Sequence, residues 1–136
     1  MIPGLLAPHA ERAYGAMRVI FGLLFAIHGM QKLFGILGAQ ALPIASQMGI
    51  GGVIEFVGGL LIAFGLFSSW AAFLASGQMA VAYLQFHWKF QFSAAFFPVV
   101  NKGELAVLYC FAFLYIACRG PGAFSLDAYR SNAKVD

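Results

Sequence analysis

Ionisable side chains are rare in this sequence, and five of them recur at similar depth in its apolar segments. Only 10% of the 136 residues are charged, whereas 62% are hydrophobic. These five are His28, Lys32, Glu55, His87 and Glu104. If the segments are antiparallel helices, all five lie toward the same end. An ionisable group within a membrane is costly unless it is paired or hydrated, so each is a candidate functional residue.

The residue types in this cluster suit three kinds of chemistry. A quinone head group needs hydrogen-bond donors at its carbonyl oxygens and a group that moves protons, which His and Glu supply. Histidine with carboxylate also suits zinc or iron, for which His28, Glu55, His87 and Glu104 are the expected ligands. Haem would take His28 and His87 as axial ligands. The spacing does not select one of these.

Two further side chains are expected to contact a bound molecule. Lys32 follows His28 by one helical turn, and Tyr83 precedes His87 by one turn, so each pair shares a helix face. Structural interpretations stand beside the functional ones. Glu55 and His28 could form a buried pair that fixes helix register, His87 and Glu104 border the interface, and Lys32 can extend to it.

The elements that position these residues are expected to be four transmembrane helices. A spanning helix needs about 20 mostly apolar residues, and the windows that qualify are residues 16–37, 49–67, 70–87 and 103–118. Small residues at four-residue spacing, such as Ala72, Ser76 and Ala80, favour close helix packing. We therefore predict one all-α membrane domain over residues 1–136, an antiparallel four-helix bundle with a tail at 119–136.

Composition and charge indicate the location of the chain. A mean hydropathy of +0.84 excludes an ordinary soluble fold and makes the lipid bilayer the expected surroundings. The eight Lys and Arg residues are scattered, so the net charge of +3 does not indicate nucleic acid. Five basic residues lie on the side of the termini and three lie in the loops on the opposite side, and this excess predicts cytoplasmic termini. The expected location is the bacterial inner membrane.

Three remaining polar residues receive structural interpretations. Arg18 lies about two turns inside the first helix and needs a partner, for which Asp127 in the tail is a candidate. Cys110 and Cys118 are eight residues apart on one helix, about 12 Å along its axis, so they cannot form a disulfide with each other.

Four motifs in this order resemble the DoxX family of small bacterial membrane proteins. They are R-x9-H-G-x-x-K-L-F-G from Arg18, E-F-x-G-G-x-L-x-x-x-G-L from Glu55, N-K-G-E-L-A-x-L-Y from Asn101 and G-P-G-x-F-S-L-D from Gly120. The resemblance covers about residues 12–130. It implies a four-helix inner-membrane protein whose relatives are linked to thiosulfate:quinone oxidoreductase subunits and to thiol-stress systems.

The first functional hypothesis is a membrane subunit of an oxidoreductase system that binds a quinone or similar redox-active molecule at the cluster. The chain lacks a nucleotide-binding glycine motif and cluster-ligating cysteines, so a redox partner protein is expected. The second hypothesis is a metal-binding or solute-transport protein, which expects homo-oligomers. The third is a membrane anchor that recruits a soluble enzyme through residues 119–136 or the Phe-rich loop.

Overall fold

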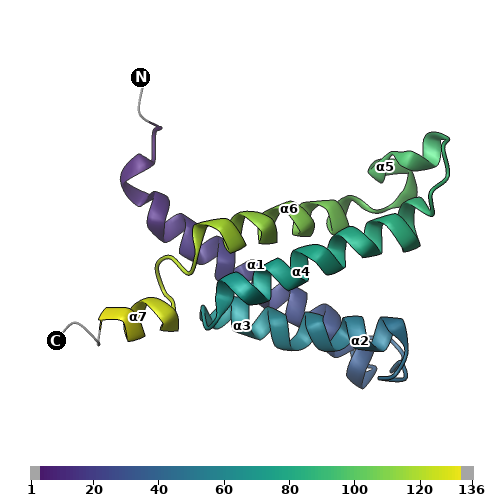
Figure 1. Ribbon diagram of the computed structural model, residues 1–136, viewed down its shortest axis with the longest axis horizontal. Coiled ribbons are helices and arrows are strands. Elements are labelled where there is room, and N and C mark those ends of the chain that lie inside the picture. The colour runs from purple at the N-terminus through teal and green to yellow at the C-terminus, as the bar shows by residue number, and fades with distance from the viewer. Residues whose placement is uncertain (1–3, 133–136) are drawn as a thin grey trace.

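The computed structural model describes residues 4–132, which are all-helical without a strand (Figure 1). Long helical segments run alternately in direction along the molecule. They are α1 (Ala10–Phe34); α2 (Gln47–Val53), η2 (Ile54–Gly58) and α3 (Gly59–Phe64) as one continuous run; α4 (Ser68–Ala82) continued by η3 (Tyr83–Trp88); and α6 (Glu104–Arg119). The short helices are η1 (Ala7–His9), η4 (Ala94–Phe96), α5 (Pro98–Asn101) and α7 (Leu126–Asn132).

Glycines end the first two long segments. Gly35 and Gly65 have φ of 64° and 66°, the left-handed conformation that closes a helix at low cost. The first helix therefore ends before the predicted residue 37, and the second before residue 67. The third segment is slightly longer than predicted at both ends, and the fourth is displaced by one residue.

Two helical segments are long and apolar enough to cross a membrane, namely Ala7–Phe34 and Gln47–Phe64. The other two long segments do not meet this criterion. Glutamines and a histidine lower the hydropathy of α4 and η3. Helix α6 has 16 residues and spans only about 24 Å, against a hydrocarbon core of about 30 Å. The all-α expectation is confirmed, and two of the four predicted spans satisfy the criterion.

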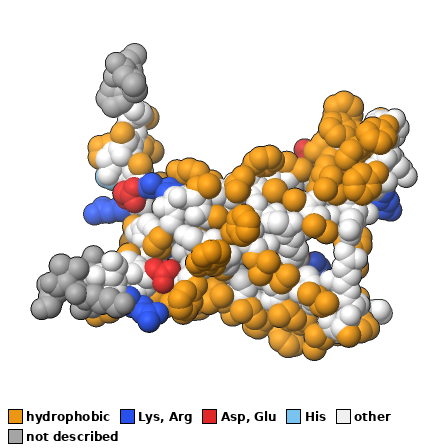
Figure 2. Space-filling model, viewed as in Figure 1, with side chains coloured by type: hydrophobic (Ala, Val, Ile, Leu, Met, Phe, Trp, Pro, Cys, Tyr) orange, Lys and Arg blue, Asp and Glu red, His pale blue; other side chains and the backbone are white. Residues whose placement is uncertain are grey.

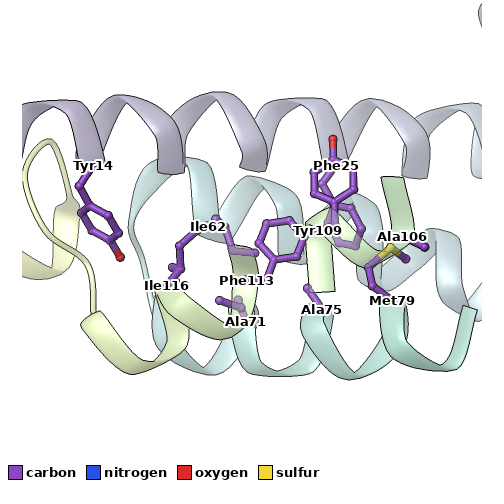
Figure 3. Packing of buried hydrophobic residues seen from close by; sticks show 11 residues of the cluster. Tyr14, Phe25, Ile62, Ala71, Ala75, Met79, Ala106, Tyr109, Phe113 and Ile116 are labelled. Carbon is purple, nitrogen blue, oxygen red and sulfur yellow. The ribbon is translucent and has the colours of Figure 1, made fainter. Parts of the chain in front are cut away.

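The long segments pack as two pairs around one core. Helix α1 lies along α2, η2 and α3, while α4 lies along α6, and α3 joins the pairs by packing on α4. Aromatic rings fill the space between α1 and α6 (Figure 3). The Phe25 ring lies 4.7 Å from Phe113 and 5.4 Å from Tyr109, measured between centroids. This contact holds α1 against the α4–α6 pair.

Glycines let α1 and its partner segment touch backbone to backbone. A Cβ atom added to Gly22 would lie 2.5 Å from the nitrogen of Ala63, and one added to Gly29 would lie 2.3 Å from the nitrogen of Phe56. Gly59 makes the reciprocal close approach to Ala26. The seam joins the helix that carries Lys32 to the one that carries Glu55.

We expect Gly29→Ala to destabilise the protein by about 1–3 kcal/mol, because the added methyl group forces the two backbones apart. The matched control is Gly77→Ala, where an added Cβ atom meets nothing within 4 Å. There the gain in helix propensity, about 1 kcal/mol at most, should leave the protein equally or more stable. Detergent-solubilised variants can be compared by chemical unfolding followed by circular dichroism. Equal effects of both substitutions would contradict the proposed seam.

Arg18 is completely buried, and backbone carbonyl groups rather than a carboxylate accept its hydrogen bonds. Its guanidinium donates to the carbonyls of Ile62 and Ala63, in the last turn of α3, where the helix dipole favours a cation. The remaining donors reach three carbonyls of the segment after α6, those of Pro121, Ala123 and Phe124.

The structure therefore corrects the expected Arg18–Asp127 contact. The carboxylate of Asp127 instead accepts a hydrogen bond from the backbone nitrogen of Ser68, at 3.3 Å, at the start of α4. Arg18 has no hydrogen bond left for it, since all its bonds go to carbonyl oxygens. Tyr14 supplies a further tie by donating to the carbonyl of Gly120 at 2.6 Å. Together these contacts hold the segment between α6 and α7 against α1 and the start of α4.

The outer surface is largely apolar (Figure 2). Large hydrophobic side chains are exposed along the length of α4 and α6, including Trp70 at 78%, Phe73 at 63% and Leu108 at 65%. Soluble monomers rarely expose apolar patches of this extent. The exposed surface is the kind that lipid covers.

Candidate functional site

A cavity of about 670 Å³ opens at the end of the molecule away from α7. Its walls come from α1, α2, η2, α4, η3 and α6, so each of the long segments contributes. Figure 2 shows the hollow between the ends of α2 and α4. The volume lies within the range of small-molecule pockets, about 300–1,000 Å³.

One wall of the cavity carries an ion pair between a half-buried lysine and a buried glutamate. Glu55 is only 2% exposed, and its Oε1 atom lies 2.5 Å from the Nζ atom of Lys32. The Nε2 atom of Gln78 donates to the same carboxylate oxygen at 2.9 Å and to the carbonyl of Gly51 at 3.1 Å. The other carboxylate oxygen, Oε2, is buried without a hydrogen-bond partner. A buried carboxyl group with an unused oxygen is a strong candidate for ligand contact.

Local helix geometry positions three of the predicted site residues. Glu55 lies in η2, Tyr83 and His87 lie in η3, and both elements are π-helical turns within otherwise α-helical runs. Such turns are uncommon and frequently mark functional sites. Lys32 lies in the last turn of α1, where the helix dipole stabilises its positive charge.

Both predicted histidines line the cavity. The His28 ring stands edge-on to Tyr109, with the centroids 6.4 Å apart. The Nδ1 atom of His87 lies 3.2 Å from the carbonyl oxygen of Asn101, which fixes the ring against the loop before α6. The cavity therefore joins four of the predicted residues: His28, Lys32, Glu55 and His87.

Glu104 and Tyr83 are not among the residues that line the cavity. Glu104 is exposed at the first residue of α6, a position where the helix dipole favours a carboxylate. The hydroxyl of Tyr83 donates to the carbonyl of Phe96 and accepts from the Nδ2 atom of Asn101 at 3.3 Å. Tyr83 thus holds the loop between η3 and α6, and the predicted ligand contacts of both residues stay predictions.

Five polar residues of the cavity were missed as site residues by the sequence reasoning: Gln47, Ser76, Gln78, Lys102 and Tyr109. Gln78 could have been found, because a carboxamide in the middle of an apolar segment needs a partner for the same reason as an ionised group. The role of Gln47 could not have been found. It depends on a hydrogen bond to Gln85, at 2.6 Å, between two residues of separate helical segments.

The rim of the cavity is apolar and exposed. Its members include Met48 and Ile50 of α2 and Phe73 and Leu74 of α4, each more than 40% exposed. Helix α4 packs on η2 and α3 but has little contact with α2, which leaves the cavity open between them. A ligand can therefore reach the polar wall along an apolar surface.

The four residues expected to bind a metal ion do not form a cluster in the described part of the chain. Among residues 4–132, no group of three or more His, Cys, Asp and Glu side chains lies close enough to hold a metal ion. The four expected ligands are dispersed, since Glu104 lies outside the cavity lining and Glu55 is engaged by Lys32. The arrangement suits an organic ligand that is mostly apolar and has a polar group.

Comparisons with known proteins give one family. The sequence profile of the DoxX family matches residues 14–88. An uncharacterized protein of Haemophilus influenzae (strain ATCC 51907 / DSM 11121 / KW20 / Rd) is 37% identical over 115 residues, covering 82% of this chain and 85% of the relative. No solved structure matches.

Proposed function

Because this protein belongs to the DoxX family of membrane proteins, we propose that it is a four-helix inner-membrane subunit of an oxidoreductase system. Its cavity binds a quinone or a similar membrane-soluble redox ring. With cytoplasmic termini, the cavity lies in the outer half of the bilayer. The redox partner protein supplies or takes up the electrons, since this chain has no nucleotide-binding motif of its own.

The observation that carries this proposal is the unpartnered, buried Oε2 atom of Glu55, a residue that lines a mainly apolar cavity. A buried polar atom without a hydrogen bond costs about 1–3 kcal/mol. A ligand with one polar group and an apolar body recovers that cost and covers the apolar walls as well. The couple of a quinone and its hydroquinone meets both requirements, since the ring covers the apolar walls and the hydroquinone form carries O–H donors for Oε2. The apolar rim between α2 and α4 offers this ring a route from the lipid.

The residues of the cavity have separate roles toward such a ligand. Lys32 keeps two N–H groups besides the one directed at Glu55, and these can bind a ring oxygen. Glu55 can accept or return a proton through Oε2, while His28 offers an imidazole on the same lining. A bound quinone would supply two-electron, two-proton redox chemistry. Phe25, which is 1% exposed, keeps the inner wall dry.

We expect binding of the reduced, hydroxyl-bearing ring to be lost or weakened at least tenfold by His28→Ala and by Glu55→Gln, since both change the polar lining. Protein purified in mild detergent with its native lipids is reduced and oxidised, and the ultraviolet difference spectrum reports bound quinone. Glu11→Gln is the matched control, because Glu11 is exposed in α1 and pairs with Arg119 outside the cavity.

The same spectrum separates the other hypotheses. A Soret band would indicate bound haem in place of a quinone, with His28 and His87 as the candidate axial ligands. A flat spectrum, with no binding of added quinone, would overturn the proposal in favour of the anchor hypothesis. In that case truncation after Arg119 should release the soluble partner, whereas the cavity variants should retain it.

A further inference from the structure

The buried polar atoms that lack partners at the cavity wall are both hydrogen-bond acceptors. They are the Oε2 atom of Glu55 and the Oε1 atom of Gln78. The orientation of the Gln78 amide is fixed by the carbonyl of Gly51, which can only accept, so the nitrogen faces Gly51 and Glu55. Its oxygen is therefore left as an acceptor.

His87 adds a third acceptor to the cavity lining. Its Nδ1 atom faces the carbonyl oxygen of Asn101 at 3.2 Å, so Nδ1 carries the hydrogen of this bond. In a neutral imidazole the other nitrogen, Nε2, then has a free lone pair. His87 lines the cavity together with Glu55 and Gln78.

The donors of the cavity are better hydrated than these acceptors. The Lys32 side chain is 29% exposed, so water can satisfy its remaining N–H groups. Glu55 is 2% exposed, and its Oε2 atom is buried away from water that could donate a hydrogen bond to it. A carboxylate paired with an ammonium group, as Glu55 is with Lys32, can only accept hydrogen bonds. The unmet requirement at this wall is therefore for a donor.

We propose that the cavity selects the hydroxyl-bearing, reduced form of its ring ligand over the carbonyl-bearing, oxidised form. The inference rests on the proposed function and specifies its ligand. A hydroquinone has two O–H donors, one of which binds Oε2 of Glu55, whereas a quinone offers acceptors alone. Facing a buried carboxylate oxygen, the quinone meets repulsion and the hydroquinone a charge-assisted hydrogen bond.

The expected preference is about tenfold or more in dissociation constant. Tighter binding of the reduced form raises the midpoint potential of the bound couple. A tenfold preference corresponds to about 30 mV for a two-electron couple. The bound hydroquinone would therefore reduce the partner protein only if the midpoint potential of the partner is higher than that of the bound couple.

The test uses three ring ligands of similar shape on the full chain in mild detergent under anaerobic conditions. They are tetramethylhydroquinone, tetramethylbenzoquinone and the dimethyl ether of the hydroquinone, which cannot donate a hydrogen bond. Calorimetry should give the hydroquinone the lowest dissociation constant by about tenfold. Glu55→Gln should reduce or invert this preference, because its amide can place N–H groups where Oε2 lies.

The outcomes distinguish this inference from the proposed function. Equal binding of hydroquinone and quinone overturns the selectivity and leaves ring binding intact. Failure of all three ligands to bind overturns the proposed function itself. If Glu55→Gln does not fold, Gln78→Leu serves as the second variant, because it removes the other unpartnered acceptor and keeps the carboxylate. An unchanged preference in a folded variant that lacks either acceptor also contradicts the assignment.

Discussion

Replacement of Arg18 by Met is expected to destabilise the protein by about 3–5 kcal/mol, the usual cost of breaking a buried charged network. The side chain is completely buried, and five carbonyl oxygens accept its hydrogen bonds. Methionine fills much of the volume but leaves all five without their donor. Unfolding of the detergent-solubilised protein, followed by circular dichroism, measures the loss.

Two comparisons show whether the geometry of the guanidinium matters. Arg18→Lys keeps the charge but has three donors in place of five, so we expect a smaller loss of about 2 kcal/mol or more. Arg12→Met makes the same chemical change at an exposed position of α1, where the effect should stay within about 0.5 kcal/mol. Similar stability of the Arg18→Met and Arg12→Met variants would show that the carbonyl network contributes little.

The Arg18 network also accounts for glycines in two of the sequence motifs, the one that begins at Glu55 and the one that begins at Gly120. Gly65 closes α3 with its carbonyl bonded to the nitrogen of Asp127 at 2.9 Å, and an added Cβ atom there would lie 2.3 Å from Ser125. The G-P-G segment after α6 supplies the carbonyl of Pro121 to Arg18, and its Gly122 leaves room for the Tyr14 ring, from which an added Cβ atom would lie 2.5 Å. These motifs are therefore accounted for by helix ends and one buried cation.

The sequence was sufficient to predict the helical class and the approximate position of each long segment. Apolar runs bounded by Gly, Pro and charged residues predict helices in lipid without knowledge of their neighbours. It also placed His28, Lys32, Glu55 and His87 at one end of the molecule. This worked because the depth of a residue depends on its distance along the helix, which the sequence gives directly.

Side-chain partners could not be predicted in the same way. The expectation for Arg18 assumed that a cation pairs with a carboxylate, whereas backbone carbonyls at a helix end serve equally well and cannot be seen in residue types. Glu55 was expected near His28, but its contacts are Lys32 and Gln78. The π-helical turns change the direction of the side chains at Glu55 and His87. No pattern of residue types in the sequence predicts these turns.

Substitutions in the Lys32–Glu55 pair should have the second large effect on stability. They also distinguish a structural role of this pair from a role in ligand binding. Lys32→Met leaves the carboxylate of Glu55 buried without its counter-ion, which should cost about 3 kcal/mol or more of stability. Glu55→Gln keeps an oxygen for Lys32 and Gln78 and should cost less. The double variant Lys32→Met with Glu55→Gln contains neither charge, so we expect it to recover most of the stability lost in Lys32→Met.

Ligand binding decides what the recovered stability means. If the pair serves only to fix the register of α1 against η2, the stable double variant should bind a hydroquinone ring as well as the original protein does. If the pair belongs to the site, the double variant should be stable and yet bind at least tenfold more weakly, because the charged acceptor and donor are both gone. A stable double variant with undiminished binding would therefore assign Lys32 and Glu55 to the fold, and the cavity would have to hold its ligand through its histidines and apolar walls.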